Sequence, residues 1–168
     1  DLRTGNLQDV LKDSDNAIQF ALKTDSPSSP NRVRRALHFK GLAYLKMSAI
    51  EESIQTAEKL KASILESPNP RLMHHYHHLK GMIDLEQQSF EQAVENFEKA
   101  LSFQTGDPND KRADYIQSLA RVYVASGNIE KAQEEYEKIT STLVYRYSYG
   151  DCYARSFYEL GKIYEEKG

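Results

Sequence analysis

The chain has 168 residues and a net charge of −3, and 39% of its residues are hydrophobic. This length is enough for one domain with a hydrophobic core, and so small a charge argues against proteins that bind nucleic acid or anionic membrane surfaces. No apolar run approaches the roughly 20 residues of a membrane-spanning helix. Cys152 is the single cysteine, so an internal disulfide is excluded, which fits a reducing, cytoplasmic compartment.

Helical patterns follow one another along the whole chain, as one array over residues 1–168. Residues 1–23 contain "GNLQDVLKDSDNAIQFAL", which opens like the later stretch "GNIEKAQEEYEKIT", and they predict one helix. Apolar residues at spacings of three and four predict two helices in each of the next three ranges and one in the last, about eight helices in all. These ranges are 32–65, 71–104, 110–145 and 151–168.

A small residue recurs in the first helix of each predicted pair. It stands at Gly41, Gly81, Ala120 and Gly161, at intervals of 40, 39 and 41 residues. Twelve residues after each of the first three comes another small residue, in the second helix. A small residue in the middle of a helix indicates that a neighbouring helix approaches closely. The chain is therefore a repeat array with a period of about 40 residues.

This pattern resembles the tetratricopeptide repeat, in which antiparallel helix pairs stack into a right-handed superhelix. The resemblance is carried by Leu119, Tyr123, Gly127, Ala132 and Tyr136 in one unit, and by Gly81, Ala93, Phe97 and Ala100 in the unit before it. It implies an all-α fold with three whole repeats, preceded by the second helix of one repeat (1–23) and followed by the first helix of another (151–168). HEAT-like helix pairs, whose period is also near 40, are the alternative fold.

The resemblance implies a protein-interaction scaffold with a groove lined by the first helix of each pair. A peptide or a partner segment is the expected ligand, and the parent is expected to be a larger bacterial signalling protein that this array regulates. A structural spacer or oligomerisation array without a specific ligand is the alternative. The expected groove residues are Arg35, His38, Leu42, His75, His78, Met82, Gln117, Arg121, Arg155, Tyr158 and Lys162.

Four histidines lie within five residues, in the stretch "HHYHH" that begins at His74. His74 and His78 are one turn apart, and two imidazoles at that spacing can chelate zinc or nickel. A structural zinc site needs four ligands, and neither an "HExxH" motif nor a cysteine partner is present. His38 stands one repeat before His78, so stacking would bring the two close. The histidines are interpreted as residues of the groove face, with a metal site as the less favoured hypothesis.

No catalytic constellation is present: the chain has no P-loop, GxGxxG, GxSxG or CxxC motif. The chain is therefore predicted to be non-catalytic and to need no cofactor.

The alternation of Tyr145, Tyr147 and Tyr149 predicts an extended stretch that packs over the end of a second helix. Repeat arrays usually end in polar capping helices, so the two half repeats suggest a fragment that self-associates through open ends, where Leu160, Ile163 and Tyr164 would lack their partner helix.

Overall fold

The computed structural model describes residues 6–24, 26–103 and 112–167, and these residues form helices and turns without any strand. None of the described helices is long and apolar enough to cross a membrane. In chain order the helices are α1 (Leu7–Lys23), α2 (Ser29–Lys46), α3 (Ile50–Leu65), the short 3-10 helix η1 (Pro70–Leu72), α4 (Met73–Glu86), α5 (Phe90–Ser102), α6 (Ala113–Ala125), α7 (Ile129–Ser141), α8 (Leu143–Ser148) and α9 (Gly150–Lys167).

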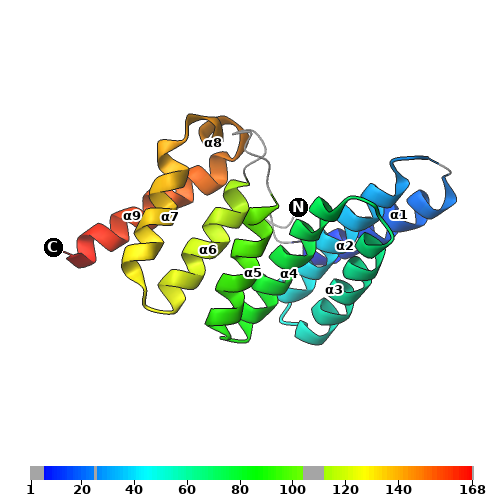
Figure 1. The fold of residues 1–168 in the computed structure, drawn as a ribbon, viewed down its shortest axis with the longest axis horizontal. Helices are drawn as coiled ribbons and strands as arrows, with labels where there is room; N and C mark the ends of the chain where they lie inside the picture. The colour runs from blue at the N-terminus through cyan, green and yellow to red at the C-terminus, as the bar shows by residue number, and fades with distance from the viewer. Residues whose placement is uncertain (1–5, 25, 104–111, 168) are drawn as a thin grey trace.

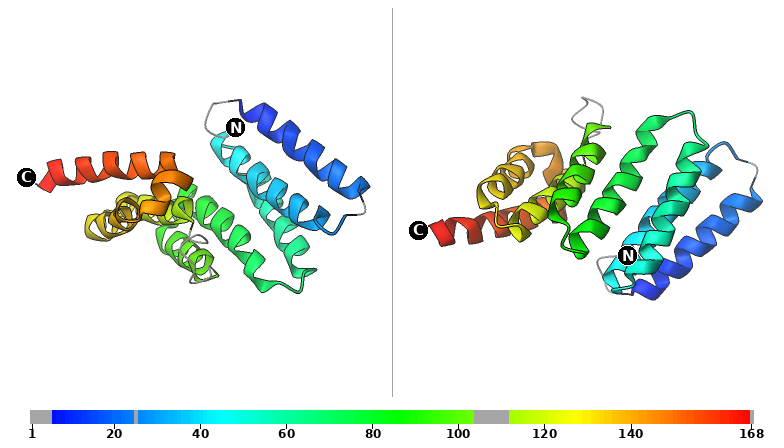
Figure 2. Two further views of the ribbon diagram at one scale, coloured as in Figure 1. Left: turned by 90° about the horizontal axis from the view of Figure 1, so that it is seen from above. Right: turned by 60° about the horizontal axis from the view of Figure 1, so that its bottom comes forward.

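The helices lie side by side in chain order, from α1 at one end of the molecule to α9 at the other (Figure 1). Three antiparallel pairs stand out, α2 with α3, α4 with α5 and α6 with α7. At the two ends, α1 packs on α2 and α9 packs on α7, and the array bends when it is seen from above (Figure 2). The predicted all-α fold of stacked helix pairs is confirmed.

The turn inside each of the three pairs has one geometry. The second of its three residues takes a positive φ, which is 58° at Ser48 and Gln88 and 77° at Gly127. The amide of the following residue then donates to the carbonyl five residues earlier, which closes the first helix of the pair. These bonds run from Ala49 to Tyr44 (2.9 Å), from Ser89 to Asp84 (2.8 Å) and from Asn128 to Tyr123 (2.8 Å).

The small residues of the repeat lie where paired helices meet, as their spacing indicates. A Cβ atom at Gly81 of α4 would come within 2.8–3.1 Å of the ring of Phe97 in α5. In the first pair, the Ser53 hydroxyl of α3 donates to the carbonyl of Gly41 in α2 at 3.0 Å. Phe97, Ala132 and the other small or aromatic residues at this interface are fully buried. A small residue in the first helix therefore lets the paired helices approach closely at Gly41 and Gly81.

The sequence-based expectation about the last helix needs correction. Leu160 and Ile163 do not lack a partner, because both are buried in the core cluster that contains Tyr136 of α7. Tyr164, by contrast, is 51% exposed, and its hydroxyl donates to Glu137 at 2.8 Å.

The tyrosine-rich segment differs from the prediction. Residues 143–148 form the short helix α8 instead of an extended stretch. Its Tyr145 is buried against Ala113, Ile116 and Ile139, whereas Tyr147 is exposed. The predicted packing over a second helix is thus confirmed for Tyr145, because Ile139 belongs to α7. Alternation alone misled here, since three aromatic residues at every second position also fit a single turn that buries one of them.

Candidate protein-binding surface

Three first helices are joined by a row of buried polar side chains at intervals of 40 residues. The Nε2 atom of His38 in α2 lies 3.0 Å from the Nδ1 atom of His78 in α4. The Nε2 atom of His78 lies 3.2 Å from the hydroxyl oxygen of Ser118 in α6. The same hydroxyl donates a hydrogen bond to the carbonyl oxygen of Asp114 at 2.8 Å. The histidine motif thus forms an internal link between neighbouring repeats.

Tyr115 of α6 completes this buried cluster. Its hydroxyl lies 3.0 Å from Nδ1 of His74 and 3.4 Å from Nδ1 of His75. Its ring stacks on His78, with the two ring centroids 4.0 Å apart. The guanidinium of Arg112, the N-cap residue of α6, lies 4.7 Å from the centroid of the Tyr115 ring. Five rings therefore pack between α2, α4 and α6: those of His38, His74, His75, His78 and Tyr115.

Burial keeps the imidazoles of His38, His75 and His78 neutral. Desolvation lowers the pKa of His38 and of His78 well below 6.5, with neighbouring histidines and Arg112 as further causes. Burial likewise lowers the pKa of His75 to about 2, because the charged form loses its hydration. A neutral imidazole has one donor and one acceptor nitrogen. The row can therefore be hydrogen-bonded throughout without any charge.

The two metal candidates, His74 and His78, take part in these bonds to Tyr115, His38 and Ser118. In the described residues, no three His, Cys, Asp or Glu side chains are grouped so that they could hold a metal ion. The geometry favours hydrogen bonding within the protein as the use of these two rings.

The structure distributes the predicted groove residues over three environments. His38, His75 and His78 are buried between helices and offer no surface to a ligand. Leu42, Met82 and Gln117 are half-buried, and the Gln117 amide donates to the carbonyl of Cys152 at 3.3 Å. The remaining predicted residues are exposed, and four of the five lie on α6 and α9: Arg35, Arg121, Arg155, Tyr158 and Lys162.

Positive charges of α2, α6 and α9 act on one another across the array. The pKa of Lys46 at the end of α2 is lowered by partial burial and then by the charges of Arg155 and Arg121. Neither arginine makes a hydrogen bond or ion pair with another residue of the described ranges. We call Lys46, Arg121 and Arg155 the basic surface. Sequence reasoning missed Lys46 because it stands at the last position of its helix, far along the chain from the other two.

Tyr158 and Lys162 extend this surface along α9. The ammonium of Lys162 lies 5.1 Å from the centroid of the Tyr158 ring and 3.0 Å from a carboxylate oxygen of Glu159. Tyr158 itself is exposed. The exposed surface therefore combines positive charges with an aromatic ring, and such residues are frequent in protein-binding hot spots.

Comparisons with known proteins agree with this architecture. The tetratricopeptide repeat family model matches residues 72–143. The crystal structure of BtubC (BKLC) from P. vanneervenii is similar over 96% of this chain and 67% of that one, with a TM-score of 0.73 and 17% identity, which shows a shared fold. The MamA RS-1 ArsTM double mutant, at 16% identity, covers 83% of this chain and 98% of its own, but its TM-score of 0.39 supports no argument.

No curated protein sequence matches the chain significantly. The fold assignment therefore rests on the family model and on the structural likeness, together with the repeated turns and the small residues between paired helices. The predicted resemblance is confirmed: residues 72–143 match the tetratricopeptide repeat model, and they lie within an array of stacked helix pairs.

Proposed function

We propose that the chain is a non-catalytic interaction module that binds an acidic segment of a partner protein on the basic surface. The observation that carries this proposal is the grouping of Lys46, Arg121 and Arg155 from three different helices. Like charges held together raise the energy of the unbound protein, and a carboxylate from a partner would offset that cost. The chain as a whole is acidic, with a net charge of −3, so the positive surface is a local feature.

Neighbouring side chains support binding of an extended segment. Tyr158 offers an exposed aromatic ring next to the positive charges, and Met82 is half-buried on the neighbouring first helix α4. Methionine adapts its shape to varied partners. The preferred ligand is therefore a peptide with acidic residues beside an apolar or aromatic one. His38, His75 and His78, which the sequence pattern assigns to the groove, support the helices from within and are not part of this proposed contact surface.

Binding to a library of random 15-residue peptides tests this proposal. We expect the native chain to retain peptides enriched in Asp and Glu, and the double variant Arg121→Glu/Arg155→Glu to lose them by more than about tenfold. The matched control is Lys59→Glu/Lys99→Glu, which makes the same change in net charge on exposed positions of α3 and α5. Circular dichroism checks that both variants keep their helices.

Two outcomes would contradict the proposal. The first is a native chain whose retained peptides show no acidic enrichment, and the second is a control variant that loses binding as strongly as the basic-surface variant. Retention of no peptide at all would favour a structural spacer. The role of the array as the regulatory part of a larger bacterial signalling protein, and its cytoplasmic location, remain predictions that follow from the family resemblance and the cysteine content.

A further inference from the structure

The hydrogen bonds in the row of His38, His78 and Ser118 run in one direction. The Ser118 hydroxyl has a single proton, which it donates to the carbonyl oxygen of Asp114 at 2.8 Å. Its oxygen is therefore the acceptor in the 3.2 Å bond to the Nε2 atom of His78, and this nitrogen carries a proton. Because a neutral imidazole has only one N–H group, the Nδ1 atom of His78 accepts from the Nε2–H group of His38 at 3.0 Å. Each proton of the row thus points from α2 toward α6.

This direction places the proton-accepting nitrogen of His78 at the boundary between α2 and α4. Its lone pair faces His38 of α2, whereas its N–H group faces α6. A proton added to this nitrogen would stand opposite the N–H group of His38, donor against donor. As long as His38 keeps its Nε2 proton, His78 can therefore take up a proton only when α2 moves away from α4.

The groups that act on the two histidines bring no negative charge. Burial is the main reason why the pKa values of His38 and His78 are lowered well below 6.5, and their neighbours act in the same direction. In the described part of the chain, the neighbours that act on these two histidines, or on His75 beside them, come from α2, α4 and α6. They are Arg35, His74, Arg112 and Arg121.

Acidic side chains of the helices around the row are engaged elsewhere. Asp114 of α6 pairs with Arg112, with 3.2 Å between their charged atoms. Glu58 of α3 accepts a hydrogen bond from the Tyr76 hydroxyl at 3.5 Å. From α5 the row meets the neutral ring of Phe97. A proton on either histidine of the row would therefore be a buried charge without a carboxylate beside it, which is costly.

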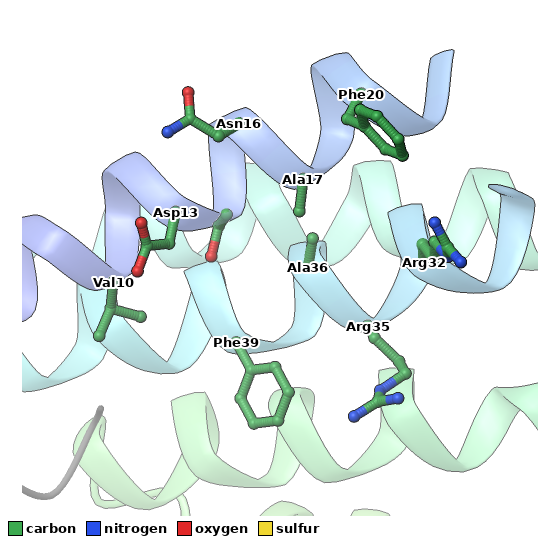
Figure 3. Close-up of a pocket in the computed structure, with 10 residues that line it drawn as sticks. Val10, Asp13, Asn16, Ala17, Phe20, Arg32, Arg35, Ala36 and Phe39 are labelled. Atoms are coloured by element: carbon green, nitrogen blue, oxygen red, sulfur yellow. The ribbon is translucent and has the colours of Figure 1, made fainter. Parts of the chain in front are cut away.

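Arg35 and Phe39 flank the α2 end of the row. Both side chains extend from α2 in Figure 3, where they line the groove between α1 and α2. The Phe39 ring lies 5.7 Å from the His38 ring. Burial is the largest cause of the lowered pKa of His75, and the charge of Arg35 adds to it. At this end as well, the side chains beside the row are apolar or positive.

We propose that the row is an acid-sensitive hinge, in which protonation of His38 and His78 separates α2 and α3 from α4 while α4, α5, α6 and α7 stay stacked. The closed form excludes protons, and the open form gives both imidazoles to water, so acid favours the open form. The bond from His78 to Ser118 does not need to break, because the N–H group of His78 continues to face α6.

Apolar contacts across the same boundary keep the hinge closed at neutral pH. Leu79 of α4 packs on Gly41 of α2, and Leu60 of α3 is buried in the same core cluster as Leu79 and Ile83 of α4. These contacts do not titrate, so they also close the hinge when the pH is raised again. Each imidazole that is protonated only in the open form raises the ratio of open to closed chains about tenfold per pH unit below 6.5. The two imidazoles of the row together raise it about 100-fold per pH unit.

The basic surface is coupled to this hinge. Lys46 belongs to α2, whereas Arg121 and Arg155 belong to α6 and α9 on the other side of the boundary. Opening therefore moves one of the three positive charges away from the other two. A loss of acidic-peptide binding with acid rests on the proposed function as well, whereas the distance between α3 and α7 depends on the hinge alone.

Spin labels on the two sides of the boundary measure the opening in the full chain. In a Cys152→Ala background, Lys59→Cys on α3 and Glu134→Cys on α7 give a labelled pair that spans the boundary. Glu91→Cys on α5 with Glu134→Cys gives a matched pair that does not span it, and all three labelled positions are exposed. Between pH 7 and pH 5 we expect a second, longer distance in the spanning pair only, while circular dichroism shows that the helices are retained.

Two histidine variants separate the hinge from a general effect of acid. His38→Gln removes one titrating group from the row, so the rise of the open population per pH unit should fall about tenfold. The matched control is His77→Gln, because His77 lies outside the row and its Nδ1 atom is 2.9 Å from the side-chain oxygen of Asn96. This control should keep the native pH dependence.

Four outcomes would overturn the proposal. They are an unchanged spanning distance down to pH 5, longer distances in both labelled pairs, and equal pH dependence of the two histidine variants. The fourth needs no variant: nitrogen chemical shifts of the native chain at pH 7 are expected to show the Nε2–H form of His38 and His78, and an Nδ1–H form of His78 would contradict the direction of the row.

Discussion

Equivalent positions of the first helices are buried in the middle of the array and exposed at its α9 end. His38, His78 and Ser118 occupy one position in α2, α4 and α6, and all three are buried and hydrogen-bonded to one another. Tyr158 occupies that position in α9 and is 66% exposed. The difference shows that a residue in this fold is buried when a following first helix stacks on it, whatever its own polarity.

The glycines of the repeat show the same contrast. Gly81 faces the ring of Phe97, whereas nothing lies within 4 Å of a Cβ atom placed on Gly161. A glycine costs helix stability, and at Gly81 the close approach of α5 explains its presence. At Gly161 no such contact exists among the described residues.

The largest expected difference between the two regions concerns their phenylalanines. Phe97→Ala removes a fully buried ring from the α4–α5 pair, and we expect the free energy of unfolding to fall by about 3–5 kcal/mol. Phe157→Ala removes a ring that is half exposed, and the loss should stay below about 1 kcal/mol. Urea denaturation at a protein concentration that keeps the chain monomeric measures both. Equal losses would mean that the middle and the end are packed alike.

The histidine row makes the middle of the array sensitive to acid. Burial lowers the pKa of His38, His75 and His78 in the folded chain, whereas the unfolded chain takes up protons near pH 6.5. Their stabilising contribution is therefore complete above pH 6.5. It is lost as the pH falls toward the folded pKa, which for His75 is about 2. The slope is up to about 1.4 kcal/mol per pH unit for each histidine.

Denaturation at several pH values between 6.5 and 5 measures this slope. The variant His78→Gln keeps a polar side chain between His38 and Ser118 but removes one titrating group. We expect its loss of stability per pH unit to be smaller than that of the native chain by up to about 1.4 kcal/mol. Identical slopes would show that His78 is not held neutral by burial.

Two buried tyrosines differ in whether their hydroxyl group is hydrogen-bonded. Tyr115 bonds to His74 and His75, so Tyr115→Phe should lower the free energy of unfolding by about 1–2 kcal/mol. Among the described residues, the buried hydroxyl of Tyr145 has no hydrogen-bond partner. Tyr145→Phe should therefore leave stability unchanged or raise it by about 1 kcal/mol. Thermal unfolding of both variants compares them, and a larger loss for Tyr145→Phe would contradict this account.

The smallest expected effects come from the two glycines and have opposite signs. Gly161→Ala gains helix propensity without a new contact, so stability should rise by roughly 0.5–1 kcal/mol. Gly81→Ala gains the same propensity but pushes a methyl group against the Phe97 ring, and we expect a net loss of about 1 kcal/mol. Denaturation of the two variants side by side would reveal the contrast, and a gain in both would contradict it.

Periodicity predicted most of the fold. The spacing of apolar residues within each helix marked the helices, and the small residues shared by two helices marked the pairs. Gly81 and Ala93 mark the pair by local pattern alone, and the offset of 40 between His38 and His78 correctly indicated that the two would meet. The α8 helix was missed because six residues are too few for a period to show. The exposed residues of the proposed surface were predicted in part, since Arg121 and Arg155 were named and Lys46 was not.

The sequence by itself determined the helices, their pairing and the period of the array, because those depend on residues a few positions apart. Only the tertiary structure decided which first-helix residues reach solvent. His75 and Tyr158 are both polar and both lie on first helices, yet one is enclosed by α2 and α6 and the other is not. Burial and the grouping of charges depend on how successive helices are rotated and spaced, and that geometry arises from packing between residues 40 or more positions apart.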